Sequence, residues 1–469
     1  KGDIMAETKD KKKELPWSAY SEAEKKELET LSKGYIEFLT KCKTERESVR
    51  EIIRQAQAAG YEDLEEIVRS GRKIAPGAKV YCAYMKKAIA LFHVGTEPLE
   101  NGLAILGAHI DTCRLDVKQN PLYEDSGLAY LDTHYYGGIK KYQWVTVPLA
   151  LHGVVAKKDG TVQDIVIGEE ASEPTFCVTD LLVHLSQEQL KKSADKVVEG
   201  EKLDVLVGTL PLAGEEKDAV QKNVLHLLQE KYGIEEDDFL SAELSFVPAG
   251  AAREMGFDRS MILGYGQDDR VCSYTSLAAM LETKPSKRTA CCLLVDKEEI
   301  GSVGATGMRS HFFENMLAEL MNALGQYSEL SVRRALASSK MLSSDVSSGY
   351  DALYAEAFDK RNVAYLGRGM VFNKFTGSRG KSGSNDANAE YLGELRAMLD
   401  KHGVRYQSAE LGKVDLGGGG TIAYIMALYG MQVIDSGVAV LSMHAPWEVT
   451  SKVDVYEVKK GYAAFLAEA

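Results

Sequence analysis

The chain has 469 residues, 45% of them hydrophobic and 27% charged, which is typical of a globular protein with more than one domain. No apolar run of about 18 residues occurs and the segment before Ala19 lacks the apolar region of a secretory signal, so neither a membrane span nor secretion is expected. The net charge of −13 disfavours nucleic acid as the main partner, because phosphate binding needs a basic surface.

The first part of the chain, residues 16–72, has the pattern of helices. Ser21 and Thr44 each precede a glutamate by three residues, which is the form of a capping box at a helix start, and apolar residues follow at helical spacing. Strand patterns come next, and the last of them runs directly into His109-Ile110-Asp111. The expected strands are Lys79–Tyr84, Ala88–Val94 and Leu103–Ala108.

Residues 118–237 have a different texture, with short strand patterns separated by polar and glycine turns and one helical stretch at Lys217–Lys231. We therefore expect a β-rich domain, inserted into a single α/β domain that comprises residues 1–117 and 238–469. The expected strands of the insertion include Trp144–Val147, Gly153–Ala156 and Asp204–Val207.

From about residue 259 onward, helical patterns alternate with apolar strand patterns. Such alternation indicates an α/β fold, a mixed sheet flanked by helices on both faces. The segments are Ser273–Leu281, Thr289–Val295, Phe313–Leu324, Ala387–His402, Thr421–Tyr429 and Val433–Ser442.

The seven cysteines are odd in number and form no C-x-x-C pair. This distribution argues against a disulfide framework and against a cysteine zinc site. It is typical of a protein in a reducing compartment, so we expect a cytoplasmic location.

Histidine and acidic residues stand just past an apolar strand or at a helix start at five places. Ligands gather at the carboxyl ends of strands in open α/β sheets, so these positions predict one shared site. Two histidines and three carboxylates can hold two divalent metals, with a further carboxylate left as a base. The positions are His109, Asp269, Glu298-Glu299, Asp345 and His444.

Two local arrangements strengthen this interpretation, because an isolated histidine or acidic pair is more often structural. In His109-x-Asp111, the carboxylate can bind the imidazole nitrogen that faces away from a metal and so orient the ring. In Glu298-Glu299, adjacent residues on a tight turn can divide the roles of base and ligand.

Five segments, in this order, closely resemble the aspartyl aminopeptidase and aminopeptidase I family of metallopeptidases, and the similarity covers roughly residues 80–469. They are GAHID (107–111), GQDDR (266–270), DKEEIGS (296–302), SSD (343–345) and SMHAPWE (442–448). The resemblance implies that Asp269 bridges two zinc ions, with Asp268 as the one-residue alternative. It implies that His109 and Asp345 complete one metal site and that Glu299 and His444 complete the other. Glu298 would be the general base, and Asp111 would orient His109.

The resemblance also implies a homododecamer, in which the inserted domain of one subunit reaches a neighbour's active site. The histidine that does so matches His184, which by composition alone would be an ordinary strand histidine. Arg379 stands where acid-selective members keep a substrate-binding lysine, with Lys374 close by. Gly418 belongs to a glycine run that would let the backbone closely approach a ligand or a neighbouring strand. Arg270 departs from the family pattern, which commonly has Asn there.

The sequence thus predicts a metal-dependent aminopeptidase that removes the N-terminal residue, acidic or neutral, from short peptides. Two zinc ions per subunit are expected, although manganese or cobalt would accept the same ligands. One alternative is another two-metal amide hydrolase on the same scaffold, a deacylase or a carboxypeptidase. The other is a catalytically silent assembly protein, against which the intact Glu298 and ligand set argue.

Overall fold

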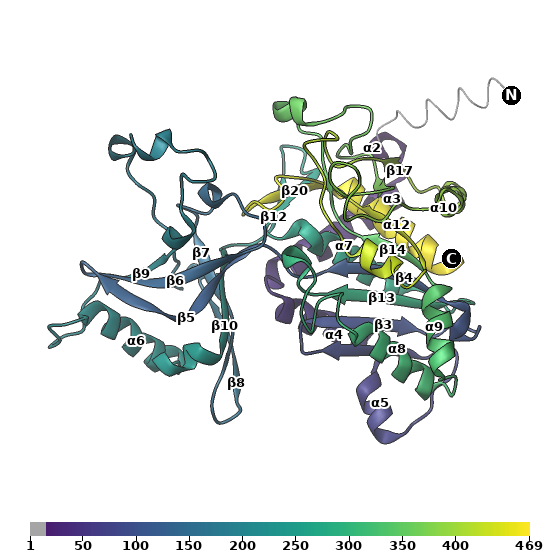
Figure 1. Cartoon of the computed structure of the whole chain (residues 1–469), viewed down its shortest axis with the longest axis horizontal. Coiled ribbons are helices and arrows are strands. Elements are labelled where there is room, and N and C mark those ends of the chain that lie inside the picture. Colours follow the sequence, from purple (N-terminus) through teal and green to yellow (C-terminus); the bar gives the residue numbers. More distant parts are fainter. Residues whose placement is uncertain (1–15) are drawn as a thin grey trace. The chain divides into compact units, whose positions relative to one another are not determined.

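A nine-stranded mixed sheet is the centre of the larger part of the chain, of which a computed structural model describes residues 16–469. The strands β13, β4, β14 and β18 are neighbours and run parallel, and Figure 1 shows β13, β4 and β14 as successive strands. In spatial order the sheet contains β1 (Glu62–Asp63), β2 (Lys79–Tyr84), β3 (Ala88–His93), β13 (Thr289–Val295), β4 (Leu103–His109), β14 (Lys340–Ser344), β18 (Gln432–Gly437), β16 (Met370–Asn373) and β17 (Tyr406–Ser408).

Helices cover both faces of this sheet, as the alternating pattern predicts. Successive residues of a strand face opposite sides, so Leu106 and Leu342 enter one apolar core while Ile105 and Met341 enter the other. The first core is covered by α3 (Glu22–Lys41), α4 (Glu45–Ala58), α7 (Gln267–Glu282), α10 (Ala389–Lys401) and α12 (Lys452–Glu468). The second is covered by α5 (Leu64–Ser70), α8 (Phe312–Ala323), α9 (Glu329–Ala337) and α11 (Ala423–Ala427).

Both predicted capping boxes are confirmed. Ser21 accepts the backbone N–H of Glu24 at the start of α3, and Thr44 accepts that of Glu47 at the start of α4, with the glutamates bonded back to the cap residues. A short helix, α2 (Pro16–Ala19), precedes α3. In the part of the chain that the structure describes, no helix is long and apolar enough to cross a membrane.

The single strand predicted at Val433–Ser442 is wrong, because the chain changes sheets there. β18 ends at Gly437, where an added Cβ would lie 2.0 Å from the carbonyl oxygen of Asp345. After Val438 the chain enters a second, five-stranded sheet. In spatial order that sheet contains β11 (Arg253–Met255), β12 (Met261–Gly264), β20 (Glu448–Ser451), β19 (Ala439–Leu441) and β15 (Ser347–Ser348).

The described chain divides into two compact units. The elements above belong to the first, which comprises residues up to Asp111, Ala252–Met443 and Glu448–Ala469. The second comprises Thr112–Ala251 together with His444–Trp447. It is wider than the predicted 118–237, because β5 begins at Arg114 and pairs with β10, which ends at Pro248.

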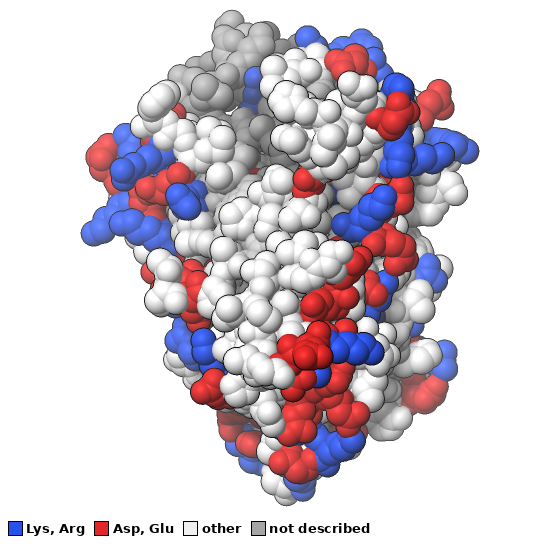
Figure 2. Space-filling model, turned by 90° about the vertical axis from the view of Figure 1, so that its left-hand side faces the viewer, with Lys and Arg blue, Asp and Glu red and all other residues white. Residues whose placement is uncertain are grey.

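The second unit is a six-stranded antiparallel sheet with the helix α6 (Ala219–Tyr232) packed against β5, β6 and β9. The strand predicted at Trp144–Val147 is wrong: this segment is a turn in which Thr146 has a left-handed φ of 60°. In spatial order the strands are β8 (Val162–Ile167), β7 (Leu149–Ala156), β10 (Ala242–Pro248), β5 (Arg114–Asp125), β6 (Leu128–Tyr136) and β9 (Val205–Gly208). Figure 2 looks onto this unit and shows a broad expanse of uncharged residues, with acidic side chains gathered along one side.

Candidate active site

Four of the predicted site residues of the first unit come from the carboxyl ends of neighbouring parallel strands. His109 is the last residue of β4 and lies opposite Val295, the last residue of β13. Glu298 and Glu299 follow β13 in the short 3-10 helix η7 (Glu298–Ile300), and Asp345 directly follows β14. The parallel arrangement brings these ends to one edge of the sheet, where ligands bind in such folds.

The ring of His109 is buried and held in one orientation. Its Nδ1 lies 3.0 Å from the backbone oxygen of Asp111 and 3.3 Å from Oδ1 of the same residue. Its Nε2 lies 3.2 Å from Oδ1 of Asp268 and 3.9 Å from Oε2 of Glu298. With Nδ1 against Asp111, the nitrogen Nε2 is the one directed at the other carboxylates, as in a metal-binding histidine.

Asp111 is fully buried and joins the end of β4 to the turn after β13. Its Oδ1 accepts the backbone N–H of Glu298 and its Oδ2 that of Glu299, each at 3.1 Å. One carboxylate therefore fixes both the imidazole of His109 and the backbone that carries the Glu298-Glu299 pair. A single side chain thus aligns the predicted base with a predicted metal ligand.

The structure favours Asp268 over Asp269 as the carboxylate that faces the other ligands. Both residues lie in the first turn of α7, but Asp268 is the one in contact with His109. Single ligand atoms of His109, Asp268 and Asp345 all lie within 4.8 Å of one another. Adjacent residues at a helix start point in different directions, and the sequence alone leaves that direction open, so the bridging role is proposed below for Asp268, the one-residue alternative to Asp269.

This buried group of side chains has more carboxylates than positive charges, and both burial and the mutual repulsion of the carboxylates disfavour their ionised form. Burial raises the pKa of Asp269 well above its usual range, and the charge of Asp268 raises it further. Burial and the charge of Asp269 likewise raise the pKa of Asp345. Burial lowers the pKa of His109, but its hydrogen bonds to Asp111 and Asp268 outweigh this and leave the pKa well above the usual range. A divalent cation would supply the missing charge.

A second set of buried groups, to which sequence reasoning assigned no role, supports Asp268. The backbone N–H of Asp268 donates to Oε2 of Glu448 at 3.2 Å. Gln267 donates to the backbone oxygens of Glu448 and Ile262 and accepts the hydroxyl of Tyr35. Gln267 lies in the segment GQDDR and Glu448 in SMHAPWE. Their place in these two segments is the feature of the sequence that could have indicated a role at the site.

Arg270, the departure from the family pattern, is fully buried. Its Nη2 donates to the backbone oxygen of Lys43 at 2.7 Å, and its guanidinium lies 5.4 Å from the ring centre of Tyr265. These contacts give it a packing role beside the site.

Two predicted site histidines belong to the second unit. The loop His444–Trp447 connects β19 to β20, and Nδ1 of His444 lies 2.9 Å from the backbone oxygen of Gly138. His184 lies in the exposed 3-10 turn Val183–Leu185, so the strand position suggested by its composition is wrong. The five predicted ligands are thus not all drawn from one unit.

The predicted substrate-binding residues lie on two loops of the first unit. Lys374 and Lys381 both pair with Asp386, at 2.8 and 3.0 Å. Arg379 is exposed, with a left-handed φ of 50°, and among residues 16–469 no carboxylate pairs with it. Gly418 has a φ of 119° and lies against the segment of Arg379.

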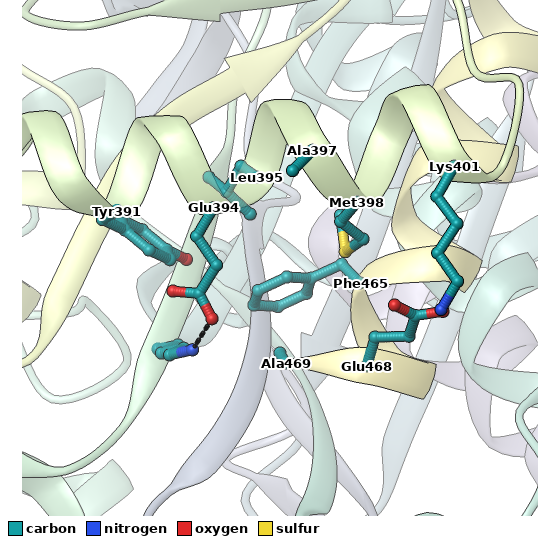
Figure 3. Close-up of a pocket in the computed structure, with 10 residues that line it drawn as sticks. Tyr391, Glu394, Leu395, Ala397, Met398, Lys401, Phe465, Glu468 and Ala469 are labelled. Carbon is teal, nitrogen blue, oxygen red and sulfur yellow. Dashed lines mark hydrogen bonds and ion pairs between the residues drawn. The ribbon is translucent and has the colours of Figure 1, made fainter.

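A pocket of about 260 Å³ between α10 and α12 is separate from these residues (Figure 3). Lys340, which lines it, begins β14, and Asp345 follows the other end of that strand. Its floor is Phe465 and Leu395, between the ion pairs Lys340–Glu394 and Lys401–Glu468. None of the predicted ligands lines it, so we assign it no part in the chemistry.

Comparisons with known proteins agree with the geometry. The model of a family described as aminopeptidase I zinc metalloprotease (M18) matches residues 38–466. This chain belongs to the M18 family. A probable M18 family aminopeptidase 1 of Clostridium acetobutylicum is 59% identical over 96% of this chain and 97% of its own.

Solved structures of M18 aminopeptidases have the same fold. An M18 aminopeptidase from Thermotoga maritima matches with a TM-score of 0.93 at 43% identity, over 97% of this chain and 99% of its own. Aminopeptidase I from C. acetobutylicum matches with a TM-score of 0.91 at 56% identity, with the same coverage. The S. cerevisiae mApe1 dodecamer, at 19% identity and a TM-score of 0.74 over 92% of this chain and 95% of its own, shares the fold.

Membership of the M18 family decides between the functions that the ligands alone left open. The chain is a zinc-dependent aminopeptidase, a hydrolase of N-terminal peptide bonds, rather than a deacylase, a carboxypeptidase or a silent assembly protein. One imidazole and two carboxylates within 4.8 Å are a donor set that suits zinc. The buried excess of carboxylates around them fits the same conclusion.

Proposed function

We propose that the enzyme uses two zinc ions, with Asp268 as the bridging ligand. His109 and Asp345 complete one ion's ligands, and Glu299 and His444 those of the other. The observation that carries the proposal is the convergence of Asp268 and Glu298 on Nε2 of His109, at 3.2 and 3.9 Å. Manganese or cobalt would be accepted by the same donors.

The chain's own residues then have distinct tasks. Bound zinc supplies Lewis acidity, which polarises the scissile carbonyl and lowers the pKa of a water. Glu298, whose side chain is 16% exposed, takes a proton from the attacking water and delivers it to the leaving amine. Asp111 holds the backbone of Glu298, so the base keeps its position through both transfers.

We further propose a closed homo-oligomer, a dodecamer like the distant yeast mApe1, in which His184 serves a neighbouring subunit. His184 would donate to the oxyanion that forms on the scissile carbonyl. The turn around it carries an exposed apolar group, unusual for a surface that stays in water. Its members are Leu181, Leu182, Val183, Leu185 and Leu190.

The substrates are short peptides, and Arg379 is the candidate selector of the first side chain. An acidic side chain needs a fixed cation to offset the loss of its hydration. Lys374 and Lys381 share the single carboxylate of Asp386, so Arg379 is the cation of this loop that has no carboxylate partner among the described residues. Seven free cysteines, four of them buried within the first unit, support a cytoplasmic location.

A mixing experiment tests the base and the shared histidine together. Glu298→Gln should keep its zinc and lose turnover by about 100-fold or more, and His184→Ala should lose turnover while keeping Glu298. Oligomers assembled from both variants contain sites with an intact Glu298 and a His184 from the neighbour. Activity should therefore return on mixing.

The double variant His184→Ala/Glu298→Gln, mixed with Glu298→Gln, is the matched control and should stay inactive. His226→Ala, an exposed histidine of the same unit, should stay active. Wild-type turnover in zinc-loaded Glu298→Gln would remove Glu298 from the base role. An active monomer in light scattering, or no recovery on mixing, would contradict the shared site.

A further inference from the structure

A partly buried hydrogen bond lies at the end of the glycine run 417–420, outside the residues assigned so far. The hydroxyl of Thr421 donates to Oδ1 of Asp435 at 2.6 Å and accepts the backbone N–H of Ala423 at 3.2 Å. Asp435 lies on the central strand β18 and is 1% exposed. Thr421 therefore fastens the end of the glycine run to the sheet.

This contact is close to the candidate metal site. Asp435 pairs in register with Ser343 of β14, and Asp345 lies two residues beyond Ser343, directly after the end of that strand. Two residues of a strand span about 6.6 Å, so the Thr421–Asp435 contact lies about this far along the sheet from Asp345. On the neighbouring strand, Gly107 pairs with Ser343 and precedes His109 by two residues.

The glycine run is locked against the loop that carries Arg379. A Cβ added at Gly418 would lie 2.4 Å from Cα of Ser378 and 2.6 Å from the backbone oxygen of Gly377. The backbone N–H of Gly419 points at the oxygen of Thr376, at 3.4 Å. Only glycine at position 418 permits the two backbones to lie this close together. The position of the loop that carries Arg379 therefore depends on the position of the glycine run.

Arg379 itself stands at the tip of a narrow hairpin. Ser378 and Ser382 exchange two backbone hydrogen bonds, at 3.3 and 3.0 Å, and Arg379 between them has a left-handed φ. The base of this hairpin is the part that touches Gly418. A displacement of the glycine run would therefore move the guanidinium of Arg379.

We infer that Thr421 and Asp435 are positioning residues for the first side chain of the substrate, because they fix the glycine run and, through it, the hairpin of Arg379. The inference rests on the proposed role of Arg379 and Gly418 in binding that side chain. When the anchor is lost, the two loops must be ordered by the substrate itself, which costs binding free energy. The loss should appear in KM more than in kcat, since the metal ligands and Glu298 are untouched.

The kinetic test uses zinc-loaded Thr421→Val, which keeps the shape of the side chain and removes the hydroxyl. Against aspartyl, glutamyl and leucyl p-nitroanilides, we expect KM to rise by about 5-fold or more and kcat to stay within about 2-fold. Thr421→Ser should restore KM toward the wild-type value. Thr40→Val is the control: its hydroxyl likewise donates one hydrogen bond, here to the backbone oxygen of Ile36 at 2.7 Å, and accepts one backbone N–H, that of Ala252 at 3.1 Å, and KM should not change.

A second readout does not depend on turnover. Arg379 and Lys381 are exposed trypsin sites on the hairpin, so loosening of the hairpin should speed cleavage there. We expect cleavage of Thr421→Val after these residues to be about 5-fold faster than in wild type or Thr40→Val, with equal zinc content. If Thr421→Val folds poorly, Thr421→Ala can replace it in this comparison of cleavage rates, because the smaller alanine side chain cannot clash with its neighbours.

Arg379→Ala separates failure of this inference from failure of the proposed function. A raised KM in Arg379→Ala with unchanged KM and cleavage rate in Thr421→Val would overturn the positioning role alone. Unchanged KM in Arg379→Ala would overturn the proposed selector. A loss of kcat at constant KM in Thr421→Val would show that Thr421 acts on the metal site, and would also overturn the inference.

Discussion

The carboxylate of Asp111 accepts the backbone N–H of Glu298 at 3.1 Å, across a separation of 187 positions in the chain. The same carboxylate lies 3.3 Å from Nδ1 of His109. The proposed metal ligand His109 and the proposed base Glu298 must keep a fixed separation throughout the reaction, and one fully buried side chain contacts both segments. Asp111 is therefore as central to the site as the groups that would touch the substrate.

Asp111→Asn should lower both zinc affinity and kcat. The amide keeps one acceptor for the turn and loses the charge that orients His109, and losses of this kind typically cost about 10- to 100-fold in metal affinity or activity. Zinc titration and steady-state kinetics would measure the two effects. Asp258→Asn is a suitable control, because Asp258 also accepts a backbone N–H but lies in an exposed turn. Wild-type zinc affinity and kcat in Asp111→Asn would contradict the role.

Asp268→Ala and Asp269→Asn should differ in metal content. Asp268 faces His109, so its loss should reduce bound zinc from two ions per chain to one or none and abolish turnover. Asp269→Asn should keep its metal. Elemental analysis after dialysis gives the stoichiometry, and removal of metal with a chelator, followed by readdition of zinc, should abolish and restore activity. The reverse pattern, with metal lost only from Asp269→Asn, would return the bridging role to Asp269.

Arg379→Ala should reduce any preference for acidic over neutral first residues. The ratio of kcat/KM for aspartyl and leucyl substrates should fall by about 10-fold, or about 1.4 kcal/mol in transition-state binding. Arg333→Ala is the control, since Arg333 is an exposed arginine of α9 that pairs with Glu329. An unchanged ratio in Arg379→Ala would show that another group selects the side chain.

Asp435→Asn should change how stability depends on pH. Burial raises the pKa of Asp435 to about 7 from an ordinary value of about 3.9, so the folded state binds this proton more tightly than the unfolded state. The contribution to the free energy of unfolding is therefore full below about pH 4 and is lost as pH rises to about 7. Its facing groups Thr421, Ser343 and Asn373 carry no charge.

Asparagine keeps an acceptor for Thr421 and cannot ionise. The melting temperature of Asp435→Asn minus that of wild type should therefore increase as pH rises from 5 to 8. The prediction concerns this change and not the size of the difference at any one pH. Melting temperatures across this range would check the expectation. A difference that stays constant with pH would assign an ordinary pKa to Asp435.

Sequence patterns predicted the central strands best. Thr289–Val295 was located with its exact ends, because it is a mostly apolar run buried on both faces of the mixed sheet. The pattern misled at Val433–Ser442, where Asp435, Ser436 and Gly437 separate two apolar stretches but do not by themselves show that the chain passes from one sheet to another. That break depends on the close approach of Asp345 to Gly437, a contact between distant parts of the chain.

The candidate site was predicted as a set of residues but not in its geometry. The sequence indicated that the carboxylate of Asp111 can bind one imidazole nitrogen of His109, and the structure has this contact, 3.3 Å from Nδ1. It left Asp268 and Asp269 unresolved, because direction at the first turn of a helix depends on backbone angles. Glu448 was quoted within a motif but received no role, because its contact with the backbone of Asp268 appears only in three dimensions.

The position of β4 in the sheet has a consequence for the newly made chain. Both strands that flank β4, β13 and β14, are encoded after the insertion that begins at Thr112. During synthesis on the ribosome, the strand that bears His109 must therefore wait for distant partners, and long-range pairing of this kind forms slowly. Its companions Asp268 and Asp345 also emerge later. Peptidase activity is thus expected only after β14 and Asp345 have been synthesised.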